Sequence, residues 1–142
     1  MSAASTIARP RVLLVEDDQD VREALRDLLE ETNIEVVGEA GDGSQGLEMA
    51  RERTPDVVLM DLRMPVMGGL EASRRLKEEM PKVQVVILTA YDDPALMEDA
   101  NAAGVYAYLV KGCPPRMLGE VTVQAWEMKR ALEAQEEPGP RR

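Results

Sequence analysis

Four apolar runs along the chain each stop at polar residues. RVLLV precedes Glu16 and Asp17, DVVLM precedes Asp61, VQVVIL precedes Thr89, and VYAYLV precedes Lys111. Continuous Val, Ile and Leu runs are typical of parallel strands that are buried on both faces of a sheet. Because open α/β sheets bind ligands at the carboxyl ends of their strands, we expect these polar side chains to meet at one sheet edge.

Segments with helical spacing alternate with the apolar runs. Val21, Leu25 and Leu28 recur at helical intervals, and further helical segments follow the other runs. We predict strands over 11–15, 34–40, 56–61, 83–88 and 105–110, and helices over 19–32, 44–53, 70–80 and 95–103 and from Pro114 onward. With right-handed crossovers, this alternation gives an α/β fold, a doubly wound five-stranded parallel sheet with helices on both faces. The fourth helix is rich in small residues, so we expect it to bury little area.

The two ends of the chain lack this pattern. Residues 1–10 are predicted to form a disordered N-terminal tail, and the folded domain is expected to span 11–131. The segment 132–142 contains two prolines and a glycine and is predicted to be a linker or a frayed helix end.

Composition excludes several classes of function. The net charge is −10, which opposes direct binding of this segment to nucleic acid or to an anionic membrane. The chain has no histidine for metal ligation or base catalysis, and its lone Cys113 has no partner for an internal disulfide. No apolar run has the length of a signal peptide core or a membrane span, so a cytoplasmic location is expected.

The acidic groups point to a metal. Two carboxylates about 4 Å apart repel each other by roughly 4 kcal/mol at an effective dielectric constant near 20. Glu16, Asp17 and Asp61 therefore need compensation, and oxygen ligands alone favour a hard ion such as Mg²⁺. A carboxylate beside Mg²⁺ can accept a phosphoryl group and form an aspartyl phosphate. Thr89 could donate a hydrogen bond to that group, and Lys111 could pair with it.

These residues carry a family resemblance. VEDD, MDLRMPVMGG, ILTA and YLVKG, in this order, resemble the CheY-like receiver domain of two-component response regulators over roughly residues 11–131. The resemblance implies strand order 2-1-3-4-5 and phosphorylation of Asp61 by a sensor histidine kinase. It also implies that Asp17, Asp61 and the backbone carbonyl of Arg63 bind Mg²⁺, with Glu16 acting through water.

The resemblance further implies a signalling switch and not an enzyme. Thr89 would follow the phosphoryl group, Lys111 would bind it, and Tyr108 would turn inward as Thr89 moves. The face formed by the fourth helix, fifth strand and fifth helix would then change shape, and a partner or a second copy would bind it. A homodimer formed on phosphorylation is therefore an expected partner state.

The segment after Lys111 indicates which subfamily of receiver domains the chain resembles. Gly112, Cys113 and two prolines follow the lysine, a pattern similar to the NarL/LuxR-type subfamily with a helix-turn-helix output domain. DNA would then be contacted only through an output domain absent from this chain, in control of transcription. The alternative is a stand-alone receiver that acts through protein–protein contacts. Gly68 before Gly69 is expected to make the loop after Asp61 more flexible.

Other interpretations stay open from the residues alone. Asp18 is better explained as a helix N-cap than as a ligand, and Tyr108 could be a half-buried aromatic on an edge strand. A hydrolase with an aspartyl nucleophile would need an acid two residues on, where Arg63 stands. A flavodoxin-like cofactor binder shares the fold, but the acidic residues after the first strand would repel phosphate. A receiver that works without phosphorylation is the remaining alternative.

Overall fold

Five strands and five helices alternate along the chain in the computed structural model, which describes residues 8–136. The strands are β1 (Arg11–Val15), β2 (Glu35–Ala40), β3 (Val57–Met60), β4 (Gln84–Thr89) and β5 (Ala107–Val110). The helices are α1 (Gln19–Glu31), α2 (Gly43–Arg53), α3 (Gly69–Glu79), α4 (Pro94–Ala102) and α5 (Pro115–Glu136). Each predicted element is present, and the boundaries differ by a few residues.

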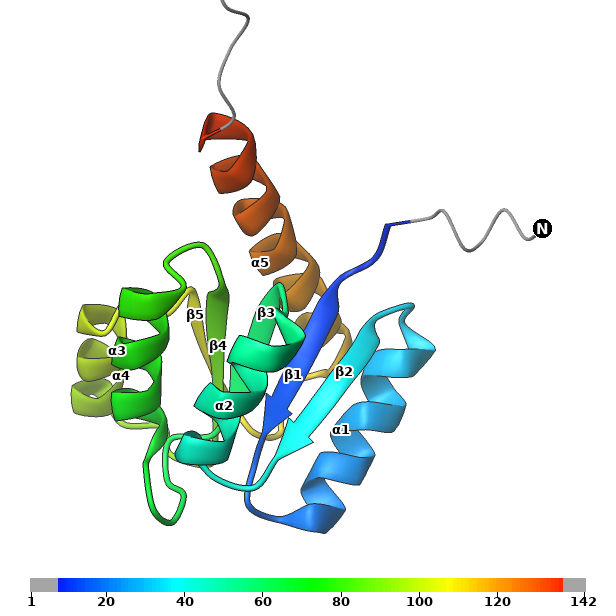
Figure 1. The fold of residues 1–142 in the computed structure, drawn as a ribbon. Helices are drawn as coiled ribbons and strands as arrows, with labels where there is room; N and C mark the ends of the chain where they lie inside the picture. Colours follow the sequence, from blue (N-terminus) through cyan, green and yellow to red (C-terminus); the bar gives the residue numbers. More distant parts are fainter. Residues whose placement is uncertain (1–7, 137–142) are drawn as a thin grey trace, which may run out of the picture.

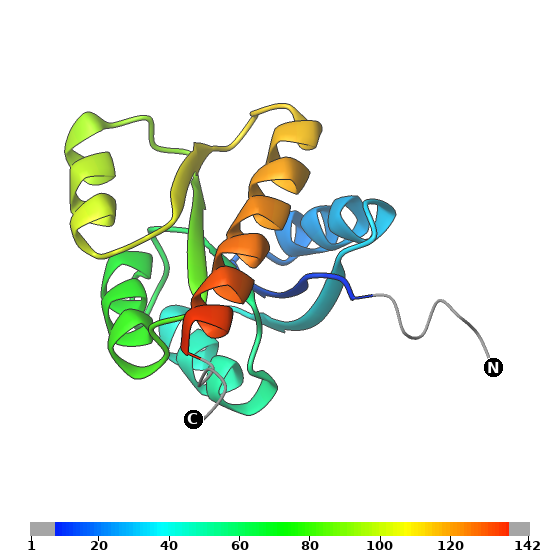
Figure 2. The same ribbon diagram turned by 90° about the horizontal axis from the view of Figure 1, so that it is seen from above.

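The strands form one parallel sheet in the order β2-β1-β3-β4-β5 (Figure 1). Helices α1 and α5 cover one face, while α2, α3 and α4 cover the other, as Figures 1 and 2 show together. The predicted doubly wound fold and strand order are confirmed. Among the described residues, no helix combines the length and the apolar character needed to cross a membrane.

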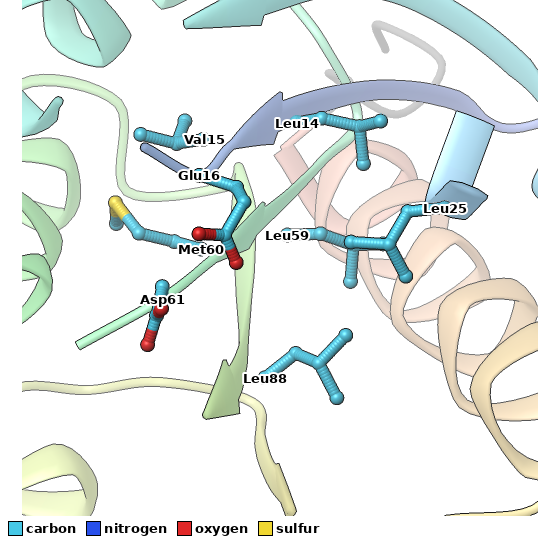
Figure 3. A pocket seen from close by; sticks show the side chains of 8 residues that line it. All are labelled: Leu14, Val15, Glu16, Leu25, Leu59, Met60, Asp61 and Leu88. Atoms are coloured by element: carbon cyan, nitrogen blue, oxygen red, sulfur yellow. The ribbon is translucent and has the colours of Figure 1, made fainter. Parts of the chain in front are cut away.

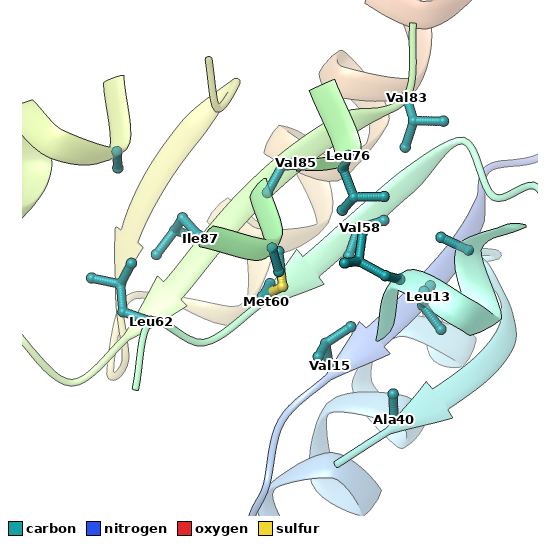
Figure 4. Packing of buried hydrophobic residues seen from close by; sticks show 14 residues of the cluster. Leu13, Val15, Ala40, Val58, Met60, Leu62, Leu76, Val83, Val85 and Ile87 are labelled. Carbon is teal, nitrogen blue, oxygen red and sulfur yellow. The ribbon is translucent and has the colours of Figure 1, made fainter. Parts of the chain in front are cut away.

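Alternate residues of the buried strands contribute side chains to two separate hydrophobic cores. In β1, Leu13 and Val15 point to the core beneath α2, α3 and α4, which Figure 4 shows. Val12 and Leu14 point to the opposite core, which α1 and α5 cover. Because side chains alternate across a strand, the central strands are fixed from both sides. The sheet is therefore a rigid platform for whatever follows its strand ends.

Side-chain caps begin three of the helices. Asp18 accepts the Val21 N–H at 3.1 Å at the start of α1, which confirms its interpretation as an N-cap. Asp42 caps α2 in the same way. Asp93 accepts the Ala95 N–H at 2.9 Å at the start of α4, and a proline follows the cap at the first helical position.

Three of the boundaries need comment. Pro10, placed in the predicted tail, is buried, and its carbonyl accepts the Glu35 N–H at 2.9 Å, so the ordered chain begins before residue 11. The strand β5 starts two residues later than predicted. The Val105 N–H instead donates to the Ala100 carbonyl and so belongs to the turn that ends α4. Helix α5 includes residues 132–136, which the prediction left as a linker or a frayed helix end, and Glu136 in its last turn forms an ion pair with Lys82. The rest of the predicted tails, residues 1–7 and 137–142, lies outside the described residues, and the domain limits stay predictions.

Candidate functional site

The strand register brings the predicted polar residues to one edge of the sheet. Val15 in β1 lies opposite Met60 in β3, and Met60 lies opposite Ile87 in β4. The Asp61 N–H donates to the Val15 carbonyl at 3.1 Å. On the other side of β4, the Lys111 N–H donates to the Thr89 carbonyl at 2.7 Å. The residues that follow β1, β3 and β5 therefore gather around one point, beside the last residue of β4.

Three carboxyl groups form an acidic cluster at this edge of the sheet. Glu16, Asp17 and Asp61 each present an oxygen, and these oxygens lie within 4.8 Å of one another. Glu16 and Asp61 are only 3% and 8% exposed, whereas Asp17 is exposed. The Leu62 N–H donates to Asp61 Oδ1 at 2.7 Å, and the Asp18 N–H donates to Glu16 Oε2 at 3.1 Å. Backbone donors thus fix both buried carboxyl groups.

Lys111 lies between the two buried carboxyl groups. Its Nζ donates to Glu16 Oε1 at 2.6 Å and to Asp61 Oδ2 at 3.1 Å. Burial lowers the pKa of Lys111, but the bonds to Glu16 and Asp61 outweigh it, so the net pKa is raised and the ammonium is retained. Burial raises the pKa of Glu16 in spite of its bond to Lys111. With all three carboxylates ionised, one ammonium still leaves an excess of negative charge.

The donor set fits a magnesium ion. It consists of carboxylate oxygens, with an exposed group at Asp17 through which a hydrated ion can enter. Beneath Glu16 and Asp61 the site is closed by leucines around a cavity of about 10 Å³, which holds no more than a water molecule. Figure 3 shows the two carboxyl groups on one side of this cavity and the leucines on the other. Any ion or phosphoryl group must therefore approach from the solvent side. The role predicted for the Arg63 carbonyl stays a prediction.

The two predicted switch residues both contact Tyr91 in the loop after β4. Thr89 is fully buried, and its Oγ1 accepts the Tyr91 N–H at 3.4 Å. Tyr108 is half-buried, and its hydroxyl donates to the Tyr91 carbonyl. Burial and the charges of Asp93, Asp92 and Asp61 raise the pKa of Tyr108, so the hydroxyl keeps its proton. Movement of either side chain on phosphorylation stays a prediction.

Sequence reasoning missed three contributors to the site. Tyr91 is the first, because the Arg63 guanidinium lies 4.4 Å from its ring centroid and joins the loops after β3 and β4. Arg22 is the second, with Nη1 donating to the Glu16 carbonyl at 2.6 Å. No local pattern marks either contact, since the partners of Tyr91 and Arg22 lie on other elements.

The third contributor is Gly69. The sequence suggested only that Gly68 before it makes this loop more flexible. A Cβ atom at Gly69 would lie 2.1 Å from the Asp61 carbonyl oxygen. Its N–H donates to the Leu62 carbonyl at 2.8 Å, so the start of α3 is held directly against the strand end that carries Asp61. Gly69 therefore permits a close approach, and Gly68 has φ −77°, an ordinary value for any residue.

Comparisons with known proteins agree with this geometry. Residues 12–122 match the family model described as the response regulator receiver domain. The chain is 42% identical over 102 residues to the transcriptional regulatory protein LiaR of Bacillus subtilis, covering 71% of this chain and 48% of that protein. It is 41% identical over 106 residues to the response regulator UvrY of Escherichia coli, covering 74% of this chain and 49% of that protein. The chain thus spans about half the length of these relatives.

A solved structure shows the same likeness over the whole fold. The two-component response regulator of the LuxR family from Aurantimonas sp. superposes with a TM-score of 0.78 at 31% identity. The match covers 91% of this chain and all of that chain. Since the family model spans most of the chain and both acidic strand ends lie within it, the chain belongs to the response regulator receiver domain family.

Proposed function

We propose that Asp61 accepts a phosphoryl group from a sensor histidine kinase and that the domain works as a phosphorylation switch. The observation that carries this proposal is the position of Lys111, whose ammonium contacts both Glu16 and Asp61 at the mouth of an acidic cluster. A cation in that position pairs with a carboxylate before transfer and with a phosphoryl oxygen after it. The domain is a signalling module in this proposal and turns over no substrate.

The transfer step needs little from the protein beyond positioning and charge. An Asp61 carboxylate oxygen attacks the phosphorus of a phosphohistidine, the new P–O bond forms as the P–N bond breaks, and the imidazole leaves with the electron pair and takes a proton from water. Bound Mg²⁺ would neutralise charge on the phosphoryl oxygens, held by Asp17 and Asp61, through water by Glu16, and by the Arg63 carbonyl. The Leu62 N–H fixes the orientation of Asp61 before transfer.

The switch would run through Tyr91. A phosphoryl group on Asp61 adds acceptor oxygens and about two negative charges, and the Thr89 hydroxyl can donate to it. Thr89 would then give up its contact with the Tyr91 N–H, while Tyr108 holds the carbonyl of the same residue. The face formed by α4, β5 and α5 would change shape and bind a partner or a second copy. Only Ala100 of α4 is buried, which suits an element that moves at little energetic cost.

The output of the switch is inferred from the relatives. Since LiaR is described as a transcriptional regulatory protein, we propose that this receiver controls a separate LuxR-type DNA-binding output domain, in the cytoplasm. DNA would be contacted only by that domain. The second candidate is a stand-alone receiver that acts through protein contacts on the same face.

Labelling of one carboxylate tests the proposal. Acetyl phosphate with Mg²⁺ should phosphorylate the wild-type chain, and Asp61→Asn should abolish the base-labile label, which hydroxylamine also removes. Asp18→Asn is the matched control, because Asp18 lies beside the cluster but serves as a helix cap that asparagine replaces well. Equal labelling of the Asp61→Asn variant would exclude the phosphoacceptor role. Turnover of phosphate esters, or a flavin spectrum, would favour the enzyme or cofactor-binding alternatives.

A further inference from the structure

The loop between β3 and α3 presents a valine in a strained conformation. Val66 has φ +67°, and the Met67 N–H donates across it to the Pro65 carbonyl at 2.7 Å. A hydrogen bond of this kind around a positive φ is the rare, strained form of the γ-turn, and a β-branched residue is poorly suited to it. Val66 is also 86% exposed, twice as much as any other exposed large hydrophobic among the described residues.

The surrounding structure holds this turn in place. Met64 and Met67, on either side, pack inward against the core beneath α2, α3 and α4. The Met67 carbonyl accepts the Gly43 N–H at 2.9 Å, and a Cβ at Gly43 would lie 2.5 Å from the same oxygen. The loop is therefore pinned against α2, and Val66 projects into solvent from a fixed backbone. Strain of this kind at an exposed side chain points to function, since packing gains nothing from it.

The position of the loop identifies what would contact it. Asp61 is only 8% exposed, and the loop begins at the next residue, so the loop forms part of the rim around the carboxylate. A small phosphodonor can reach a recessed carboxylate without touching the rim. A protein that carries a phosphohistidine has to press its own surface against the rim to bring phosphorus to Asp61.

Apart from Tyr91, whose ring lies against Arg63, the other loops of the rim present mainly charged groups. Asp17 and Asp18 are exposed after β1, and Asp92 and Asp93 are exposed after β4. These carboxylates attract a basic surface over long range, but salt screens them and they do not by themselves provide a close-fitting contact. A rigid apolar side chain among them supplies that contact and loses little conformational entropy when it is buried.

We propose that Val66 is an apolar anchor for the histidine-containing phosphodonor protein. The donor would receive it in an apolar depression beside its phosphohistidine, with basic residues facing the exposed carboxylates. This inference rests on the proposed phosphorylation of Asp61. It assigns to Val66 a role in recognition of the protein donor and no role in the transfer chemistry.

Two substitutions separate the anchor from the strain. Val66→Thr keeps the branched shape but adds a hydroxyl, and Val66→Gly removes the side chain and accepts a positive φ. The probe is the purified histidine kinase that labels the wild-type chain fastest among a panel, autophosphorylated with radiolabelled ATP. Both variants should raise the KM for transfer from this kinase by about tenfold, the loss expected when one buried valine contact is removed. Labelling by acetyl phosphate should keep its wild-type rate.

Melting temperatures provide an independent readout. Val66→Gly should melt higher than the wild-type chain because it relieves the turn, while Val66→Thr should melt close to it. The glycine variant would then be more stable and yet a poorer substrate for the kinase, which loss of folding does not explain. Met128→Gln is the matched control, since Met128 is an exposed apolar residue on α5 that is 42% accessible.

The outcomes separate this inference from the proposed function. Wild-type KM values for both variants with the kinase would overturn the anchor. Equal losses with acetyl phosphate would also overturn it, because Val66 would then shape the site itself. Undiminished labelling of Asp61→Asn by either donor would instead refute the phosphoacceptor role, whatever the Val66 variants do.

Discussion

At the residue scale, close packing around Asp61 constrains the site as much as charge does. The carboxyl group is held by the Leu62 N–H and Lys111, and its own carbonyl has Gly69 directly against it. These contacts fix both the backbone and the side chain of Asp61, so the carboxyl group is held in one orientation. Preorganisation of this kind lowers the cost of bringing reacting atoms together.

Two adjacent glycines test this constraint. Gly69→Ala should lower the free energy of unfolding by about 1–3 kcal/mol, the usual cost of overpacking, because its Cβ would lie 2.1 Å from the Asp61 carbonyl oxygen. Gly68→Ala is the comparison and should cost less, since its Cβ would lie 3.0 Å from the Leu62 carbonyl oxygen, a tight contact that a small shift relieves. Urea unfolding of both variants, together with acetyl phosphate labelling, checks the difference. Equal stability of the two variants would contradict the packing argument.

At the scale of elements, the ends of the sheet away from the site are joined by ion pairs. Lys129 in α5 contacts Asp56, just before β3, at 3.0 Å, and both side chains are only 15% exposed. The second oxygen of Asp56 accepts the Arg11 N–H at 2.9 Å, which adds β1 to the cluster. One carboxylate thus joins three elements at the edge opposite to Asp61.

This cluster predicts a particular pH dependence. Burial lowers the pKa of Lys129, but its bonds to Asp56 and Glu133 outweigh it, so the folded-state pKa lies above the ordinary value of 10.5. The stability that Lys129 contributes is therefore complete below pH 10.5 and is lost as the pH rises through the higher folded-state pKa. Lys129→Met should cost about 1–3 kcal/mol at pH 8, and the gap should narrow at strongly alkaline pH. Urea unfolding of both proteins across this range measures it, and a constant gap would contradict the assignment.

The elements also show what sequence patterns can and cannot predict. The strands were predictable because residues such as Val57 and Val58 are buried on both faces and leave an uninterrupted apolar run. The meeting of Glu16, Asp61 and Lys111 followed from parallel strands that end at one edge. The contact of Arg63 with Tyr91 was not predictable, because it joins two loops whose shapes depend on the assembled sheet. The continuation of α5 to Glu136 was left open between a helix end and a linker, because the residues there have no apolar face.

At the scale of the whole molecule, an ion bound at the acidic cluster would link ion binding to folding. The three carboxyl groups come together only in the native state, so an ion that binds them stabilises the fold by mass action. The sheet edge bears an excess of negative charge that the fold itself does not neutralise. The molecule should therefore be more stable with Mg²⁺ than without it.

Thermal unfolding in the presence of Mg²⁺ tests this link. Magnesium at about one hundred times its dissociation constant should add about 2.7 kcal/mol to the free energy of unfolding. Asp17→Asn should remove most of this gain, because it takes one carboxylate from the cluster. Asp18→Asn should keep the gain, and Na⁺ at matched ionic strength should not reproduce it. A gain that survives in the Asp17 variant would place the ion elsewhere.

The bridge made by Lys111 has a consequence for the time at which the domain becomes reactive. Its partners Glu16 and Asp61 precede it by 95 and 50 residues, so the bridge is among the most non-local contacts of the chain. Contacts of this kind form late, because long loops must close first. During synthesis, Glu16 and Asp61 would leave the ribosome well before Lys111 does. The domain would therefore become able to accept a phosphoryl group only when the last strand has joined the sheet. A partly synthesised chain would not be phosphorylated.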